Sequence, residues 1–152
     1  MAASAWQLYN SAKKYIGNGT ITLGAGVFKM VLAKASSNAS TFTISTFASV
    51  TNEIAAAGGY VAGGRNLVPA TAQWVAGASA KQMKFTQTTT GLTFTASGAN
   101  LVDIKYAIIR NSTGSGAGKL LCFCRLSSSQ FTVTSPNTLT IIPAATGIFT
   151  LT

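Results

Sequence analysis

The sequence predicts a mostly-β protein, an antiparallel β-sandwich or jelly-roll-like barrel, with a short N-terminal helix. Short stretches of alternating polar and apolar residues recur along the chain, and turn residues separate them at a spacing of roughly 8–12 residues. Apolar residues make up 47% of the 152 residues, enough for a hydrophobic core without disulfides. We therefore expect one domain over residues 1–152, with a helix or arm at 1–17 and the sandwich at 18–152.

The N-terminal segment has the apolar spacing of a helix. Its apolar side chains recur every three to four residues, at Ala5, Leu8, Ala12, Tyr15 and Ile16. Ser4 is the expected N-cap, and Lys13 and Lys14 suit the negative end of the helix dipole. Gly17 is expected to end the helix, and Asn18-Gly19 to form a tight turn.

Strand signals dominate the rest of the chain and predict nine to eleven short strands. The expected strands cover residues 20–23, 27–34, 67–74, 83–88, 92–95, 104–110, 120–126, 131–134, 139–142 and 148–151. The stretch 104–110 is the strongest candidate for a central strand, followed by a hairpin-type loop at 111–118. The nearly continuous apolar run 120–126 predicts a strand that is buried on both faces.

A glycine-rich segment, Gly58 to Arg65, interrupts these signals. Two glycine pairs bracket Tyr60 and two small residues, and glycine permits sharp bends and close backbone approach. A phosphate-binding loop would need a Lys-Ser/Thr ending, which this segment lacks. The favoured interpretation is a bulged strand between two turns.

The charge distribution is strongly one-sided. Eleven Lys and Arg stand against two acids, Glu53 and Asp103, and the net charge is +9. Charged residues make up only 9% of the chain, against about 25% in an average soluble domain. A surface with few charges loses little hydration when it packs against neighbours, and the excess of cations favours an acidic protein, nucleic acid or anionic lipid as partner.

The residues that usually carry catalysis are scarce. The chain has no histidine, and its two acids are fifty residues apart in sequence, so Glu53 is expected in a loop or cap and Asp103 beside a cation. Cys122 and Cys124 would share one strand face about 7 Å apart, too far for a disulfide. We expect buried, reduced thiols, and no catalytic, metal or cofactor site.

Nucleic-acid binding is the main alternative drawn from composition. Lys29, Lys105 and Arg125 fall in the middle of expected strands and should point outward. The aromatic side chains that could stack on bases are Trp6, Tyr9, Tyr15, Tyr60 and Trp74. No recognised nucleic-acid motif is present, and the favoured interpretation places these rings in the core or at a subunit interface.

The order of several stretches resembles a family of small virion structural proteins of tailed bacteriophages, found among head and tail assembly proteins. These stretches are WQLYNSAKKYIGNGTI at 6–21, FKMVL at 28–32, GYVAGG at 59–64, LTFTA at 92–96, IKYAII at 104–109, LLCF at 120–123 and GIFTL at 147–151. They span nearly the whole chain and are structural rather than catalytic.

The resemblance implies a capsid cement or decoration protein that binds the outer shell and staples neighbouring capsomers. The implied partners are the major capsid protein and further copies of the chain, as a dimer or trimer. The implied location is the capsid surface of the virion, after synthesis in the host cytoplasm. It implies no small-molecule substrate, membrane or direct DNA contact. A tail or head–tail connector protein and a basic nucleic-acid-binding protein remain the alternatives.

The expected interface combines the N-terminal segment with the glycine-rich segment, because their features exceed what a core role needs. Its residues are Trp6, Tyr9, Lys13, Lys14, Gly59, Tyr60, Gly63, Gly64 and Arg65. Lys13, Lys14 and Arg65 are the expected contacts with acidic neighbours.

Overall fold

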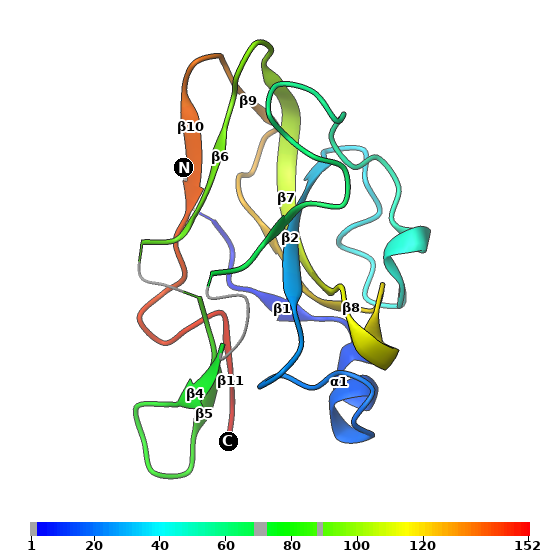
Figure 1. Cartoon of the computed structure of the whole chain (residues 1–152), viewed down its shortest axis with the longest axis vertical. Helices are drawn as coiled ribbons and strands as arrows, with labels where there is room; N and C mark the ends of the chain where they lie inside the picture. Colours follow the sequence, from blue (N-terminus) through cyan, green and yellow to red (C-terminus); the bar gives the residue numbers. More distant parts are fainter. Residues whose placement is uncertain (1–2, 69–72, 88–89) are drawn as a thin grey trace.

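The computed structural model describes residues 3–68, 73–87 and 90–152, and it confirms a mostly-β, sandwich-like fold with antiparallel sheets and one short α-helix (Figure 1). In chain order the elements are β1 (Gln7–Leu8), α1 (Asn10–Gly17), β2 (Phe28–Lys34), η1 (Phe47–Ser49), β3 (Arg65–Asn66), β4 (Trp74–Ala76), β5 (Met83–Phe85), β6 (Leu92–Thr95), β7 (Leu101–Asn111), η2 (Gly114–Gly116), β8 (Leu120–Arg125), β9 (Phe131–Val133), β10 (Thr138–Ile141) and β11 (Phe149–Leu151).

The large sheet is built around β7, as the sequence predicted. Its strand order is β1-β8-β7-β2-β3, and β9 also pairs with β7. In register, Ile108 of β7 lies between Val31 of β2 and Phe123 of β8. The run of buried residues in β8 from Leu120 to Cys124 confirms a strand enclosed on both faces.

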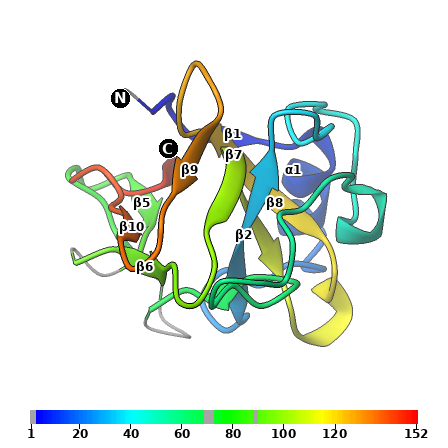
Figure 2. The same cartoon turned by 90° about the horizontal axis from the view of Figure 1, so that it is seen from above.

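Two small sheets form a second layer. β6 pairs with β10, and β5 lies between β4 and β11. In Figure 2 β5, β6 and β10 lie on one side of β2 and β7, while α1 lies on the other. Ring contacts join the layers: Phe28 meets Phe85 edge-on at 4.9 Å, and Tyr60 lies 5.9 Å from Phe94. Burial of each such large apolar side chain contributes about 1.5–3 kcal/mol.

The helix begins later than predicted. It starts at Asn10 rather than near Ala5, because the preceding residues form β1, where Gln7 is paired with Phe123. This pairing satisfies backbone groups along β8 that would otherwise be orphaned. Ser4 is therefore not an N-cap, and its Oγ instead accepts a hydrogen bond from the Arg125 amide at 3.0 Å.

Two further local predictions were wrong, and two more strands differ in extent from those expected. Residues 20–23 form a bend and turn rather than a strand, although Ile21 and Leu23 are buried. The glycine-rich segment makes two turns followed directly by the short β3, with no strand between the turns. The strand expected at 83–88 is confirmed in part, as the shorter β5, and of the described residues in the strand expected at 67–74 Trp74 alone belongs to a strand, β4; residues 69–72 and 88 lie outside the described part.

We predict that Ile108→Ala lowers the free energy of unfolding by about 3 kcal/mol, because Ile108 is fully buried between two strands and its loss leaves a cavity. Val102→Ala on the same strand is the control. Val102 is 38% exposed, and its truncation should cost less than about 1 kcal/mol. Urea unfolding followed by circular dichroism measures both, and equal losses would contradict the assigned position of β7.

Candidate functional site

The structure divides the nine expected interface residues between opposite edges of the large sheet. Trp6 and Tyr9 flank β1, and Lys13 and Lys14 follow on α1, whereas Arg65 belongs to β3. β1 and β3 are the two ends of the strand order. The residues therefore do not form one continuous patch.

In the N-terminal group, Tyr9 is a core residue. It is fully buried, its hydroxyl donates to the Ala39 carbonyl at 2.6 Å, and its ring lies 5.1 Å from Phe123. Burial raises the pKa of Tyr9 well above its ordinary value. A partner cannot reach this side chain in the folded protein.

Two lysines on α1 and a third beside it form a cationic surface, which we call the lysine patch: Lys13, Lys14 and Lys119. Lys13 and Lys14 are exposed on the helix. The Lys119 ammonium lies 5.1 Å from the centre of the Tyr15 ring, a cation–π contact. Sequence reasoning missed Lys119 because only the β7–β8 hairpin brings it back to the helix.

The glycine-rich segment is held by a hydrogen-bond network around Glu53. One carboxylate oxygen of Glu53 accepts from the Tyr60 hydroxyl at 2.6 Å and from the Gly63 amide at 2.7 Å. The Tyr60 hydroxyl also accepts from the Leu32 amide at 3.2 Å. Burial, with the hydrogen bond to Glu53, raises the pKa of Tyr60 well above its ordinary value. The network ties the segment to β2.

Arg110 of β7 completes the attachment. Its Nη2 and Nε donate to the Gly63 carbonyl at 2.9 and 3.2 Å, and its guanidinium lies 4.5 Å from the centre of the Phe47 ring. Burial lowers the pKa of Arg110, and the nearby Glu53 carboxylate opposes that shift. The sequence did not indicate that Glu53 and Arg110 lie close together, because they are 57 residues apart.

The glycine pair Gly63-Gly64 is explained by packing. Both residues have positive φ, and a Cβ on Gly64 would overlap the Met30 carbonyl while one on Gly63 would lie 2.8 Å from Nη2 of Arg110. Tyr60 is buried as well, so these three expected interface residues serve the fold. Gly59 and Arg65 remain exposed.

Arg65 is partly engaged within the chain. Its Nη1 donates a hydrogen bond to the carbonyl of Thr93 in β6. The contact links the edge strand of the large sheet to a small sheet. The remaining donors of the exposed guanidinium stay available to an acidic neighbour.

The two acids lie beside the same end of β2, but each has its own partners. The Glu53 backbone bridges to Ala33, and the Asp103 carboxylate lies 3.7 Å from the Lys34 ammonium. The expected loop position of Glu53 and the expected ion pair of Asp103 are confirmed. In the described ranges no group of three or more Cys, Asp or Glu side chains could hold a metal ion.

The two cysteines are free and buried, as predicted. Burial raises the pKa of Cys124 to about 12, and burial raises that of Cys122 well above its ordinary value. A thiolate is the reactive form of cysteine, so both side chains are held in their inert state.

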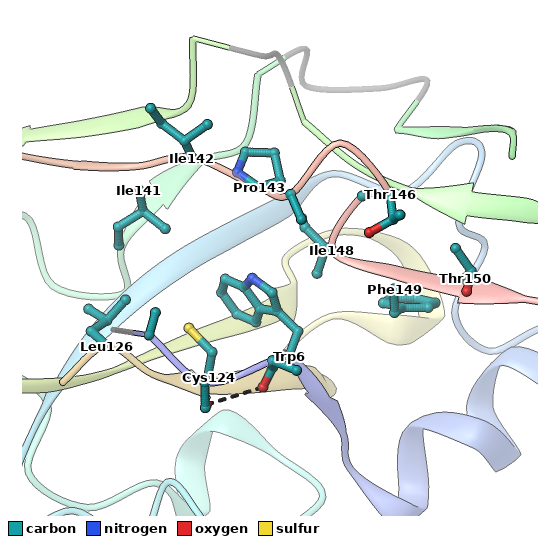
Figure 3. Close-up of a pocket in the computed structure, with 15 residues that line it drawn as sticks. Trp6, Cys124, Leu126, Ile141, Ile142, Pro143, Thr146, Ile148, Phe149 and Thr150 are labelled. Carbon is teal, nitrogen blue, oxygen red and sulfur yellow. Dashed lines mark hydrogen bonds between the residues drawn. The ribbon is translucent and has the colours of Figure 1, made fainter. Parts of the chain in front are cut away.

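A groove of about 670 Å³ runs between the N-terminal segment and the C-terminal residues 141–150. Figure 3 shows the Trp6 ring in this groove, between Cys124 on one side and Ile148 on the other. Of the expected interface residues, Trp6 alone lines it. Sequence reasoning missed the groove because its walls come from both ends of the chain.

Comparison with known proteins found no match among family models, curated proteins or solved structures. No helix in the described part of the chain is long and apolar enough to cross a membrane. The fold and surface define a mostly-β protein that carries a cationic helix and an uncharged groove.

We predict that Tyr60→Phe lowers the free energy of unfolding by about 2 kcal/mol, because it leaves the Leu32 amide and the Glu53 carboxylate short of a partner. Tyr106→Phe is the control, since the Tyr106 hydroxyl makes no hydrogen bond with any described residue. That change should cost less than about 0.5 kcal/mol. Denaturant unfolding compares them, and equal stability of the two variants would contradict the network.

A second prediction concerns the thiols. At pH 8 the folded protein should react with an aromatic disulfide reagent far more slowly than the unfolded protein, in which both Cys122 and Cys124 become accessible. Release of the coloured thiolate measures the rate with and without denaturant. Rapid reaction of either cysteine in the folded protein would contradict the buried arrangement of β8.

Proposed function

We propose that this protein is a bacteriophage virion structural protein of the capsid cement type, which binds the outer shell and staples neighbouring capsomers. Its partners in this proposal are the major capsid protein and further copies of itself. The resemblance of its sequence stretches to phage assembly proteins suggests the setting. The surface chemistry supports an acidic protein lattice as the binding partner.

The observation that carries the proposal is the internal use of both acids. Glu53 accepts hydrogen bonds from Tyr60 and Gly63, and Asp103 pairs with Lys34. The exposed lysines of α1 have no acid close enough to pair with them in the described ranges. Their charge is therefore available to a partner, and it would both accelerate and orient docking on an acidic shell.

The edges of the large sheet also favour contact through side chains and loops. The strands at the two ends of its strand order, β1 and β3, have two residues each, and beyond them the Ser4 amide donates to the Arg125 carbonyl of β8 and the Ile54 amide to the Leu32 carbonyl of β2. Very short edge strands suppress uncontrolled strand pairing between copies. A protein that must bind many equivalent shell sites without aggregating would benefit from this arrangement, and avidity over several modest contacts supplies the affinity.

A nucleic-acid-binding role is favoured by one feature, the lysine patch beside Tyr15. Phosphate binding of that kind would weaken steeply as salt is raised. Gel-shift assays with single- and double-stranded DNA at low salt separate the two functions. A shift at low salt that disappears with salt would favour nucleic acid, and its absence would remove that alternative.

A tail or connector role would place the protein in isolated tails instead of heads.

We predict that the purified protein binds expanded, preformed phage heads and raises their resistance to heat. Reversal of the helix charges in Lys13→Glu/Lys14→Glu should weaken binding about tenfold, because these cations face the acidic shell. Co-sedimentation with heads measures affinity, and the temperature of DNA release measures the protection.

The matched control is Lys81→Glu/Arg125→Glu, which makes the same change of net charge at two exposed cations away from α1. It should weaken binding less than about threefold. Equal losses in the two double variants would show that only net charge matters. Absence from heads together with presence in isolated tails would contradict the cement proposal.

A further inference from the structure

The uncharged groove lies beside a free strand edge. β11 pairs with β5 through one edge, and in the part of the chain that the structure describes no strand pairs with the other. Phe149 and Thr150 of β11 line the groove, opposite the N-terminal segment that carries Trp6 (Figure 3). The backbone groups along such an edge can accept one more strand.

The groove walls combine apolar side chains with uncharged polar groups. Trp6, Leu126, Ile141 and Ile148 contribute apolar surface, and none of the fifteen lining residues is charged. Ile142 at the rim is 61% exposed. Exposing an apolar side chain of this size to water is unfavourable in free energy. A strand lying along β11 could place alternate side chains into the groove while the others face solvent.

Trp6 adds a directional feature. Its ring is half-buried in the groove, and its indole N–H makes no hydrogen bond with any described residue. A tryptophan at a contact surface commonly donates this N–H to its partner. An occupant with a carbonyl or carboxylate near the ring would satisfy the donor.

Charge identifies the class of occupant. A second copy would bring another net charge of +9, and both of its acids are engaged internally. Nucleic acid is disfavoured because its phosphates would meet an uncharged wall. Lys84 of β5 pairs with Thr150 of the groove wall, and its ammonium, 3.3 Å from the Ala145 carbonyl, can attract an anionic side chain.

We propose that this groove binds an extended, acidic segment of a partner protein, which adds as a strand to the free edge of β11. Apolar side chains of the segment fill the space around Trp6, and its acidic residues lie toward Lys84. The inference rests on the proposed function only in taking an acidic protein as the partner.

The test uses the full-length protein, labelled with ¹⁵N, and a synthetic peptide with an alternating valine–threonine core flanked by glutamates. A peptide with the same core and flanking lysines is the comparison. We expect the glutamate peptide to shift the Trp6 indole resonance and to slow amide exchange in Phe149–Leu151, and the lysine peptide to bind at least about tenfold more weakly.

Two variants with the same change of charge locate the site. Ile142→Glu places an anion at the rim of the groove and should weaken binding of the glutamate peptide by at least about tenfold. Val61→Glu introduces the same charge at a side chain that is 65% exposed and does not line the groove. It should weaken binding of the glutamate peptide less than about twofold. Both positions are exposed enough for the variants to fold.

Equal losses in the two variants, shifts confined to other regions, or no binding at the highest soluble peptide concentration would overturn the inference. The peptide experiment contains no phage particle, so its result is independent of binding to heads. Peptide binding without binding to heads would leave the groove assignment standing and remove the cement function. Binding to heads without peptide binding would remove the groove assignment and leave the cement function standing.

Discussion

The rest of the structure depends on the backbone pairing of β7 with its neighbours. This strand pairs with β2 along seven register positions and with β8 along five, and β9 joins it at its N-terminal half. Each neighbour positions one segment: β8 holds the N-terminal segment through β1, and β2 holds the glycine-rich segment. The left-handed backbone of Asp103 lies at the irregularity where β7 passes from β2 to β9. Such a bulge redirects a strand without ending it.

The glycine-rich segment illustrates how a polar network can serve packing rather than recognition. The Glu53 carboxylate accepts hydrogen bonds from the Tyr60 hydroxyl and the Gly63 amide. The Arg110 guanidinium donates to the carbonyl of the same glycine, Gly63. Gly63 is thus held from both sides of its peptide units. Hydrogen bonds to charged groups contribute more than neutral ones, so this arrangement fixes a loop that few apolar contacts would hold.

The sequence predicted those parts of the fold that depend on local pattern. The sequence correctly predicted the strand at 92–95, the buried run of β8 and the central position of β7. These features follow from the alternation and hydrophobicity of side chains within a few consecutive residues. The start of α1 was not, since helical spacing from Ala5 to Ile16 was overridden by pairing of Gln7 with Phe123. The contacts that bury Tyr60 and Gly64 could not be predicted from local pattern, because only tertiary packing brings Leu32 and Met30 against them.

The separation of charge from the groove has a physical logic. Lysines spread over the surface act at long range, where they attract an acidic partner before any contact forms. A groove lined with charges would lose part of that attraction to desolvation when it closed over an occupant. An uncharged groove beside a free strand edge avoids this loss, because backbone hydrogen bonds and apolar burial supply the short-range affinity. The Lys84 ammonium, beside the groove, donates to the Ala145 carbonyl at 3.3 Å, and this contact favours a position of the ammonium close to the groove before an acidic side chain arrives.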